Sequence, residues 1–230
     1  MKKAFTLAEV LITLGIIGVV AAMTLPTLVA NYKKQVMATQ AKKGYNIIMN
    51  MMTKIQADEG ANDLKSTSLI SGGVCAFDAE FNYSGSFSIN NKNGCEDLYG
   101  NPSVIEGIIT KYLKVVKVCK GNSCDISYKD DPLAYVKRSN GDNFMGFYTN
   151  DGMIIYVSPI GYQYNPSGSM LSFAYDTNGE KGPNEMGRDL FVLNFCMNGD
   201  ITYSGDSCTG SSSDNGYLKR LMSNGWKMDY

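Results

Sequence analysis

One acidic side chain lies inside the first apolar run of this 230-residue chain. Glu9 is the only charged residue in the run 5–26. A carboxylate inside such a run costs free energy unless a cation or hydrogen-bond donor meets it. The pattern therefore predicts a partner for Glu9. The alternative is a side chain that snorkels to the surface of a membrane.

A second group of oxygen-bearing side chains lies in the segment 176–189. Four of them have the chemistry of calcium ligands: Asp176, Asn178, Glu180 and Asp189. The first three occupy alternate positions, which lets one turn aim them at a single hard cation. The twelfth position is Gly187, where an EF-hand carries its bidentate glutamate. We therefore expect either a calcium site or a metal-free hairpin loop, which Gly, Asn and Pro also favour.

The rest of the residue inventory argues against catalysis. The chain has no histidine, which excludes Ser-His-Asp and Cys-His nucleophile arrangements and the usual zinc sites. Carboxylate pairs such as Asp130-Asp131 are adjacent and are expected to point apart. The formal net charge of −1 gives no basic footprint for nucleic acid. We predict a protein that is not an enzyme and requires no cofactor.

The cysteines indicate export. All six lie beyond the apolar run: Cys75, Cys95, Cys119, Cys124, Cys196 and Cys208. An even number in one region is typical of disulfides in an oxidising compartment. Proximity favours the pairs Cys75–Cys95, Cys119–Cys124 and Cys196–Cys208, and the other pairings stay open. Zinc ligation is the alternative, although no C-x-x-C spacing occurs.

The first element expected is one long helix. The run 5–26 is long enough to cross a bilayer at about 1.5 Å per residue. Its charged region is too short and its apolar part too long for a signal peptide, and no A-x-A site follows, so we expect the segment to remain. Pro26 predicts a kink or a weak turn. Apolar residues then recur along one face, which predicts packing on a head domain: Leu28, Tyr32, Val36, Ala41, Tyr45, Ile48, Met52 and Ile55.

The N-terminal segment also resembles a known family. Residues 2–30 read KKAFTLAEVLITLGIIGVVAAMTLPTLVA, which is similar to the leader and first helix of type IV pilins and type II secretion pseudopilins. The resemblance covers residues 1–57. It implies that a prepilin peptidase cuts between Ala4 and Phe5 and methylates the new amine, and that Glu9 is the assembly carboxylate. Ala4 departs from the Gly that the family usually has there. The loop 176–189 likewise resembles the calcium-binding segment of major pseudopilins.

This resemblance implies a structural subunit of a type II secretion or type IV pilus-like filament. In such an assembly a neighbour shifted along the axis could bring its Glu9 to the Phe5 amine, so that each charge offsets burial of the other. The implied partners are the peptidase, other subunits, an inner-membrane assembly platform and membrane lipid. The protein would cross the inner membrane once with its head in the periplasm or outside the cell. The alternative is an extracytoplasmic binding protein or enzyme that uses the helix only as an anchor.

The sequence predicts an α+β fold, in which the long helix packs on a small antiparallel sheet. The division expected is a leader 1–4, a transmembrane half 5–26, an amphipathic half 27–59 stopped by Gly60, and a globular head 60–230. Residues 61–100 read as a loop-dominated connection. Helices are predicted from Asn101-Pro102 to near Cys119, and over 217–222 between Asp214 and Asn224-Gly225. Strands are predicted at 144–148, 153–157 and 190–195, with weaker candidates at 170–175 and 201–203.

Overall fold

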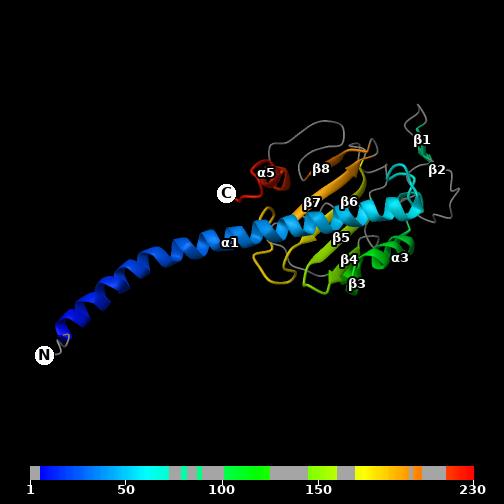
Figure 1. Cartoon of the computed structure of the whole chain (residues 1–230). Helices are drawn as coiled ribbons and strands as arrows, with labels where there is room; N and C mark the ends of the chain where they lie inside the picture. Colours follow the sequence, from blue (N-terminus) through cyan, green and yellow to red (C-terminus); the bar gives the residue numbers. More distant parts are fainter. Residues whose placement is uncertain are drawn as a thin grey trace.

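A computed structural model describes residues 6–72, 79–81, 87–89, 101–124, 145–159, 169–196, 199–203 and 216–230. Its dominant element is α1 (Leu7–Glu59), whose N-terminal half projects beyond a head built on a six-stranded sheet (Figure 1). Helix α1 ends where predicted, because Gly60 takes the left-handed conformation at φ 64° that closes a helix. The α+β class is confirmed.

The sheet is an antiparallel meander. Its strands are β3 (Val115–Lys120), β4 (Met145–Thr149), β5 (Ile154–Pro159), β6 (Ser169–Asp176), β7 (Leu190–Cys196) and β8 (Ile201–Tyr203), and each lies beside the next in the chain. Ile155 is opposite Tyr175, and Phe173 is opposite Leu193. Successive side chains of a strand point to opposite faces. The register therefore gathers the large apolar residues of neighbouring strands on one face.

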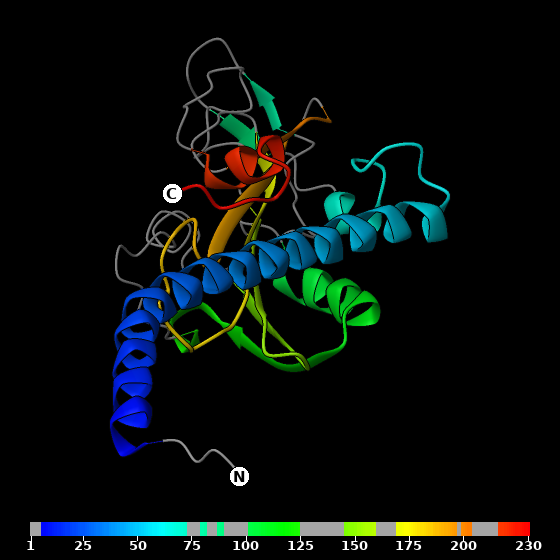
Figure 2. The same ribbon diagram turned by 60° about the vertical axis from the view of Figure 1, so that its left-hand side comes forward.

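That face forms the core under the helices. Helix α1, α3 (Pro102–Tyr112) and α5 (Tyr217–Ser223) all contribute to it, and Figures 1 and 2 show α1 lying across the sheet. The sheet supplies buried aromatic and aliphatic side chains, among them Phe147, Ile155, Phe173, Tyr175, Phe191 and Leu193. A smaller buried cluster on the other face contains Cys119, Cys124, Ile154, Tyr156, Ala174 and Leu190.

The helix predicted to run from Asn101-Pro102 to near Cys119 is too long. Helix α3 stops at Tyr112, Leu113 is extended with ψ 141°, and Val115–Lys120 forms β3. The sequence from Val115 to Val118 suits a helix face and a strand alike. Pairing with β4, in which Val118 lies opposite Phe147, decides for the strand.

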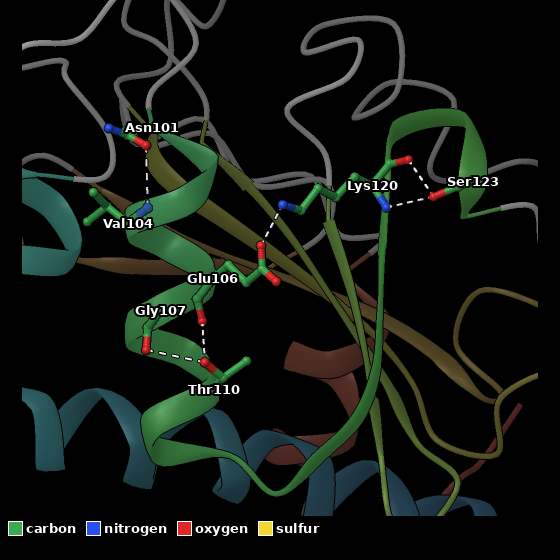
Figure 3. A network of polar contacts seen from close by, with 7 residues as sticks. All are labelled: Asn101, Val104, Glu106, Gly107, Thr110, Lys120 and Ser123. Carbon is green, nitrogen blue, oxygen red and sulfur yellow. Dashed lines mark hydrogen bonds and ion pairs between the residues drawn. The ribbon is translucent and has the colours of Figure 1, made fainter.

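The start of α3 and the end of β3 are linked by polar contacts (Figure 3). Asn101 Oδ1 accepts from Val104 N at 3.4 Å, which confirms the predicted helix start. Glu106 forms an ion pair with Lys120. Lys120 N donates to the Ser123 hydroxyl at 2.8 Å within the turn η1 (Gly121–Ser123). The Glu106–Lys120 ion pair therefore joins α3 to the edge strand of the sheet.

The remaining helices and strands refine the sequence predictions. The connection 61–100 contains α2 (Ser68–Ser71) and a small antiparallel pair, β1 (Ala79–Phe81) with β2 (Phe87–Ile89). The five strands predicted for the large sheet agree within two residues. The residue before α5 is Gly216, which has no side-chain cap, and the predicted start at Asp214 lies outside the described residues.

Candidate functional site

The N-terminal end of α1 is closed by Thr6 and Glu9. Thr6 N and the Thr6 hydroxyl each donate to Glu9 Oε2 at 2.8 Å, and Glu9 N donates to the Thr6 hydroxyl at 3.3 Å. This is a reciprocal capping box, which satisfies backbone donors at the start of a helix. The groups that donate hydrogen bonds to the Glu9 carboxylate in the structure are therefore uncharged and come from Thr6, at the start of the same helix.

The half of α1 that precedes the head is exposed to solvent in the isolated monomer. Leu7 is 79% exposed and Met23 is 74% exposed, and exposure continues to Val36. The helix is long and apolar enough to cross a membrane. The uncharged stretch between Glu9 and Lys33 spans roughly 35 Å at helical rise, close to the ~30 Å of a bilayer's hydrocarbon core. A membrane-length segment is therefore bounded by Glu9 at one end and by Lys33 and Lys34 at the other.

Pro26 lies inside α1, which continues through it. The proline ring has no N–H to donate to the carbonyl of Ala22, so one turn of the helix lacks a backbone hydrogen bond. Close by, the Thr24 hydroxyl donates to Val20 O at 3.0 Å. The N-terminal half of α1 curves away from the axis of the half that lies on the head (Figures 1 and 2).

The apolar face of α1 meets the head later than predicted. Leu28, Tyr32 and Val36 are exposed, and continuous burial begins at Ala38. From there the buried residues are Ala38, Ala41, Gly44, Ile48, Met51, Met52 and Ile55. The periodicity gives the face but not how far the sheet reaches along it, because that depends on tertiary structure.

Helix α1 approaches the sheet closely at Gly44. A Cβ atom there would lie 2.4 Å from Tyr175 Cδ2, so glycine is needed for the helix to lie against the ring. The Tyr175 hydroxyl donates to Ala41 O at 2.9 Å. Burial raises the pKa of Tyr175 well above its usual value, which keeps this hydroxyl protonated. Glycine and tyrosine together fix the axial position of α1 on the sheet.

Charged groups reinforce this contact at its rim. Lys43 forms an ion pair with Asp151 in the turn between β4 and β5, and Lys42 Nζ lies 5.9 Å from the Trp226 ring centroid. Burial tends to raise the pKa of Asp151, but hydrogen bonds from Lys43 and Thr149 outweigh it and lower the pKa. The stabilisation from this carboxylate is therefore present at neutral pH and is lost as the pH falls through its lowered pKa.

The loop 176–189 begins and ends on a buried aspartate. Asp176 Oδ1 accepts from Asn178 N at 3.0 Å and from Gly179 N at 2.9 Å. The Asp189 carboxylate accepts from Asn184 N and Glu185 N, both at 2.8 Å. Both residues are fully buried, and Glu180 is exposed. The two aspartates thus hold the backbone of the loop at its base.

The calcium prediction is not tested by this geometry. Within the described residues, no group of three or more acidic or cysteine side chains is placed to hold a metal ion. Of the four predicted ligands, Asp176 and Asp189 lie at the base of the loop and direct oxygens to backbone N–H groups.

The C-terminal segment packs on this loop. The Tyr230 hydroxyl donates to Gly187 O at 2.9 Å. Gly187 has φ 80°, and a Cβ atom there would lie 2.3 Å from the Tyr217 ring. The Tyr217 and Tyr230 rings are themselves 5.4 Å apart. Trp226 and Tyr230 both pack on the core.

The disulfide Cys119–Cys124 is confirmed and joins the end of β3 to the residue after η1. Gly146 lies opposite Cys119 and leaves room for the Cys119 sulfur, since a Cβ atom at Gly146 would lie 2.6 Å from it. Cys196 is also disulfide-bonded. Cys75, Cys95 and Cys208 lie outside the described residues, so the other two predicted pairs stay predictions.

Replacing both Cys119 and Cys124 with serine is expected to lower the free energy of unfolding by about 2 kcal/mol, because the bridge restricts a short loop of the unfolded chain. Chemical denaturation of the oxidised protein and of the double variant measures this difference. Unreduced wild-type protein that unfolds together with the variant would contradict it.

The capping box at the start of α1 has a local signal in the sequence. Thr6 and Glu9 have the T-x-x-E spacing of a capping box, which is readable from sequence. Gly44 has no such signal, because its partner Tyr175 is distant in sequence.

The comparisons with known proteins agree with this geometry at the N-terminus. Residues 1–25 match the model of the prokaryotic N-terminal methylation motif, the prepilin-type signature of type IV pilins and pseudopilins. The match includes Ala4 and Phe5, which lie outside the described residues, and Glu9. The searches of curated proteins and of solved structures found no match. The chain therefore carries a prepilin-type N-terminus on an α+β head.

Proposed function

We propose that the chain is a structural subunit of a pilin-like filament. The subunit is stored in the membrane and is assembled into the filament through α1. The observation that carries the proposal is the exposed apolar half of α1, with Glu9 as its only acidic residue, inside the prepilin-type motif. In the membrane, lipid covers this half. In a filament, the same half of neighbouring subunits covers it.

Cleavage before Phe5 would create a new cation, the Phe5 amine, which can pair with the Glu9 carboxylate of a neighbouring subunit. Glu9 now accepts from the Thr6 N–H and hydroxyl. A methylated Phe5 amine from a subunit displaced along the axis would add a charged donor, and the pair would avoid leaving either charge unpaired in an apolar setting. Each subunit offers one amine and one carboxylate at different heights. Such a heterologous contact does not close, so it propagates into a filament.

Export of the head is part of the proposal. The Cys119–Cys124 disulfide supports it, because disulfides persist in the periplasm or outside the cell. The assembly platform and the membrane lipid then act on α1, and the head remains on the far side of the membrane. The secretion pseudopilin is favoured by the similarity of the loop 176–189 to a calcium-binding segment, and the surface pilus by a large head with several disulfides.

Calcium binding separates these two roles. If the loop binds calcium, millimolar calcium should raise the Tm of the purified protein and EGTA should reverse the rise. At one hundred times the dissociation constant the gain would be about 2.7 kcal/mol. Glu180→Gln, at an exposed ligand position, should reduce the gain without lowering the Tm in EGTA, whereas the same Tm with and without calcium would remove this support for the pseudopilin role.

Mass spectrometry of the protein purified from membranes tests the proposed function. The expected N-terminal peptide begins with N-methylated Phe5. A chain that keeps Met1 would contradict filament assembly and leave the anchored binding protein or enzyme as the interpretation.

A further inference from the structure

A groove of about 620 Å³ lies between α1 and the loop 176–189. It is at the point where α1 leaves the head and its exposed half begins. One wall is formed by Tyr32, Lys33, Val36, Met37 and Gln40 of α1, and the other by Asn178, Gly182, Pro183 and Arg188 of the loop. Neither the prepilin-type motif nor the assembly of α1 accounts for it.

Two cationic side chains line this groove, one from each wall. Lys33 is exposed, and no ion pair to it occurs within the described part of the chain. Arg188 Nη1 lies 3.0 Å from Glu185 Oε2, and the Arg188 side chain is 58% exposed. The Glu185 side chain is 20% exposed and meets the guanidinium at Nη1, so the other N–H groups of Arg188 are left for a ligand. The groove therefore offers a lysine and an arginine to an anion.

The rest of the lining is apolar and aromatic. Tyr32, Val36 and Met37 form the α1 side, and Pro183 faces them from the loop. A free anion gains nothing from such a wall. A phosphate attached to glycerol and acyl chains gains from both parts of the groove, because the apolar groups can contact the ester region while the cations meet the phosphate.

The groove also lies at the expected height of the lipid headgroups. Lys33 is the first charged residue after Glu9, at the far end of a stretch of roughly 35 Å. Hydrocarbon core and headgroup layers together measure about 40–45 Å. With Glu9 at one surface, Tyr32 and Lys33 reach the opposite headgroup layer, where aromatic and basic residues are favoured.

We propose that this groove binds the phosphate headgroup of an anionic phospholipid, with Lys33 and Arg188 as the cationic contacts. The proposal rests on insertion of α1 in the membrane, which the proposed function and the anchored alternative share. A headgroup held between α1 and the loop would fix the depth and rotation of the subunit before extraction. It must be released when the subunit enters a filament.

The test uses the full chain in vesicles of phosphatidylcholine with and without phosphatidylglycerol. Flotation first establishes insertion, and native mass spectrometry then counts the lipids that remain bound. Lys33→Gln and Arg188→Gln should each weaken phosphatidylglycerol binding roughly five-fold, and together more strongly. Lys33→Arg keeps the positive charge and should bind phosphatidylglycerol as the wild type does. The control Lys54→Gln/Lys111→Gln removes the same charge at the other end of the α1 contact and should bind as wild type.

Four results would overturn the proposal. Equal retention of phosphatidylglycerol by the wild type and the Lys33→Gln/Arg188→Gln variant would show that the groove is not the site. Inorganic phosphate that binds the detergent-solubilised protein as tightly as the lipid does would assign the groove to a free anion. A photo-crosslinker at Gln40 that captures a second copy of the chain instead of lipid would make the groove a subunit contact. A protein that does not float would refute membrane insertion itself, and with it the proposed function.

Discussion

Replacing Glu9 with glutamine is expected to leave the protein in the membrane but to remove it from filaments. Glutamine can keep the capping box, because its side-chain oxygen accepts from Thr6 as glutamate does. It cannot offset a buried amine. An uncompensated charge costs about 3–5 kcal/mol, so incorporation should fall by roughly 100-fold or more. Immunoblots of sheared filaments and of membrane fractions measure the two pools.

The matched control for this experiment is Thr6→Ala. It removes the hydroxyl that accepts from Glu9 N and keeps the carboxylate. Loss of a cap costs about 1 kcal/mol, or roughly five-fold in incorporation. The two variants thus separate the structural role of Glu9 from its charge. If Glu9→Gln gave normal filaments and Thr6→Ala gave none, Glu9 would act only by capping the helix, and its charge would not be needed for assembly.

A methyl group at Gly44 is expected to loosen α1 from the sheet. The new Cβ atom would lie 2.4 Å from the buried Tyr175 ring, and the ring cannot move away without disturbing the hydrogen bond to Ala41. Overpacking of this kind costs about 1–3 kcal/mol. At about 2 kcal/mol the cost outweighs the gain of about 1 kcal/mol for alanine over glycine in a helix. Thermal unfolding of full-length Gly44→Ala in detergent should show a Tm lower by roughly 2–6 °C.

Gly107→Ala provides the opposite expectation in the same assay. Gly107 lies inside α3 with no atom within 4 Å of its added Cβ. Only the helix propensity changes, so the Tm should rise by roughly 2–4 °C. If both substitutions raised the Tm, the contact between Gly44 and Tyr175 would not limit the packing of α1.

The sequence predicts features that depend on local pattern. Gly60 ends α1, short apolar runs place five strands of the meander, and Asn101 starts α3. The prediction was wrong where two structures share one pattern: the valines after Leu113 suit a helix and a strand, and only β4 decides between them.

The contacts of the candidate site also divide into local ones, which the sequence indicates, and ones between distant residues, which it does not. The capping contact joins residues three positions apart, so sequence contains its signal. The hydrogen bond from Tyr175 to Ala41 spans 134 positions, and the groove beside Lys33 requires the loop between β6 and β7. No single-sequence pattern places these groups together, because tertiary packing brings them into contact.

The meander also affects how the head acquires its structure. Every strand in the order from β3 to β8 has its sequence neighbour as its spatial neighbour. Such a topology has low contact order for a sheet, and lower contact order accompanies faster folding. None of its backbone ladders includes α1. The six strands can therefore pair in chain order before the finished sheet packs against α1.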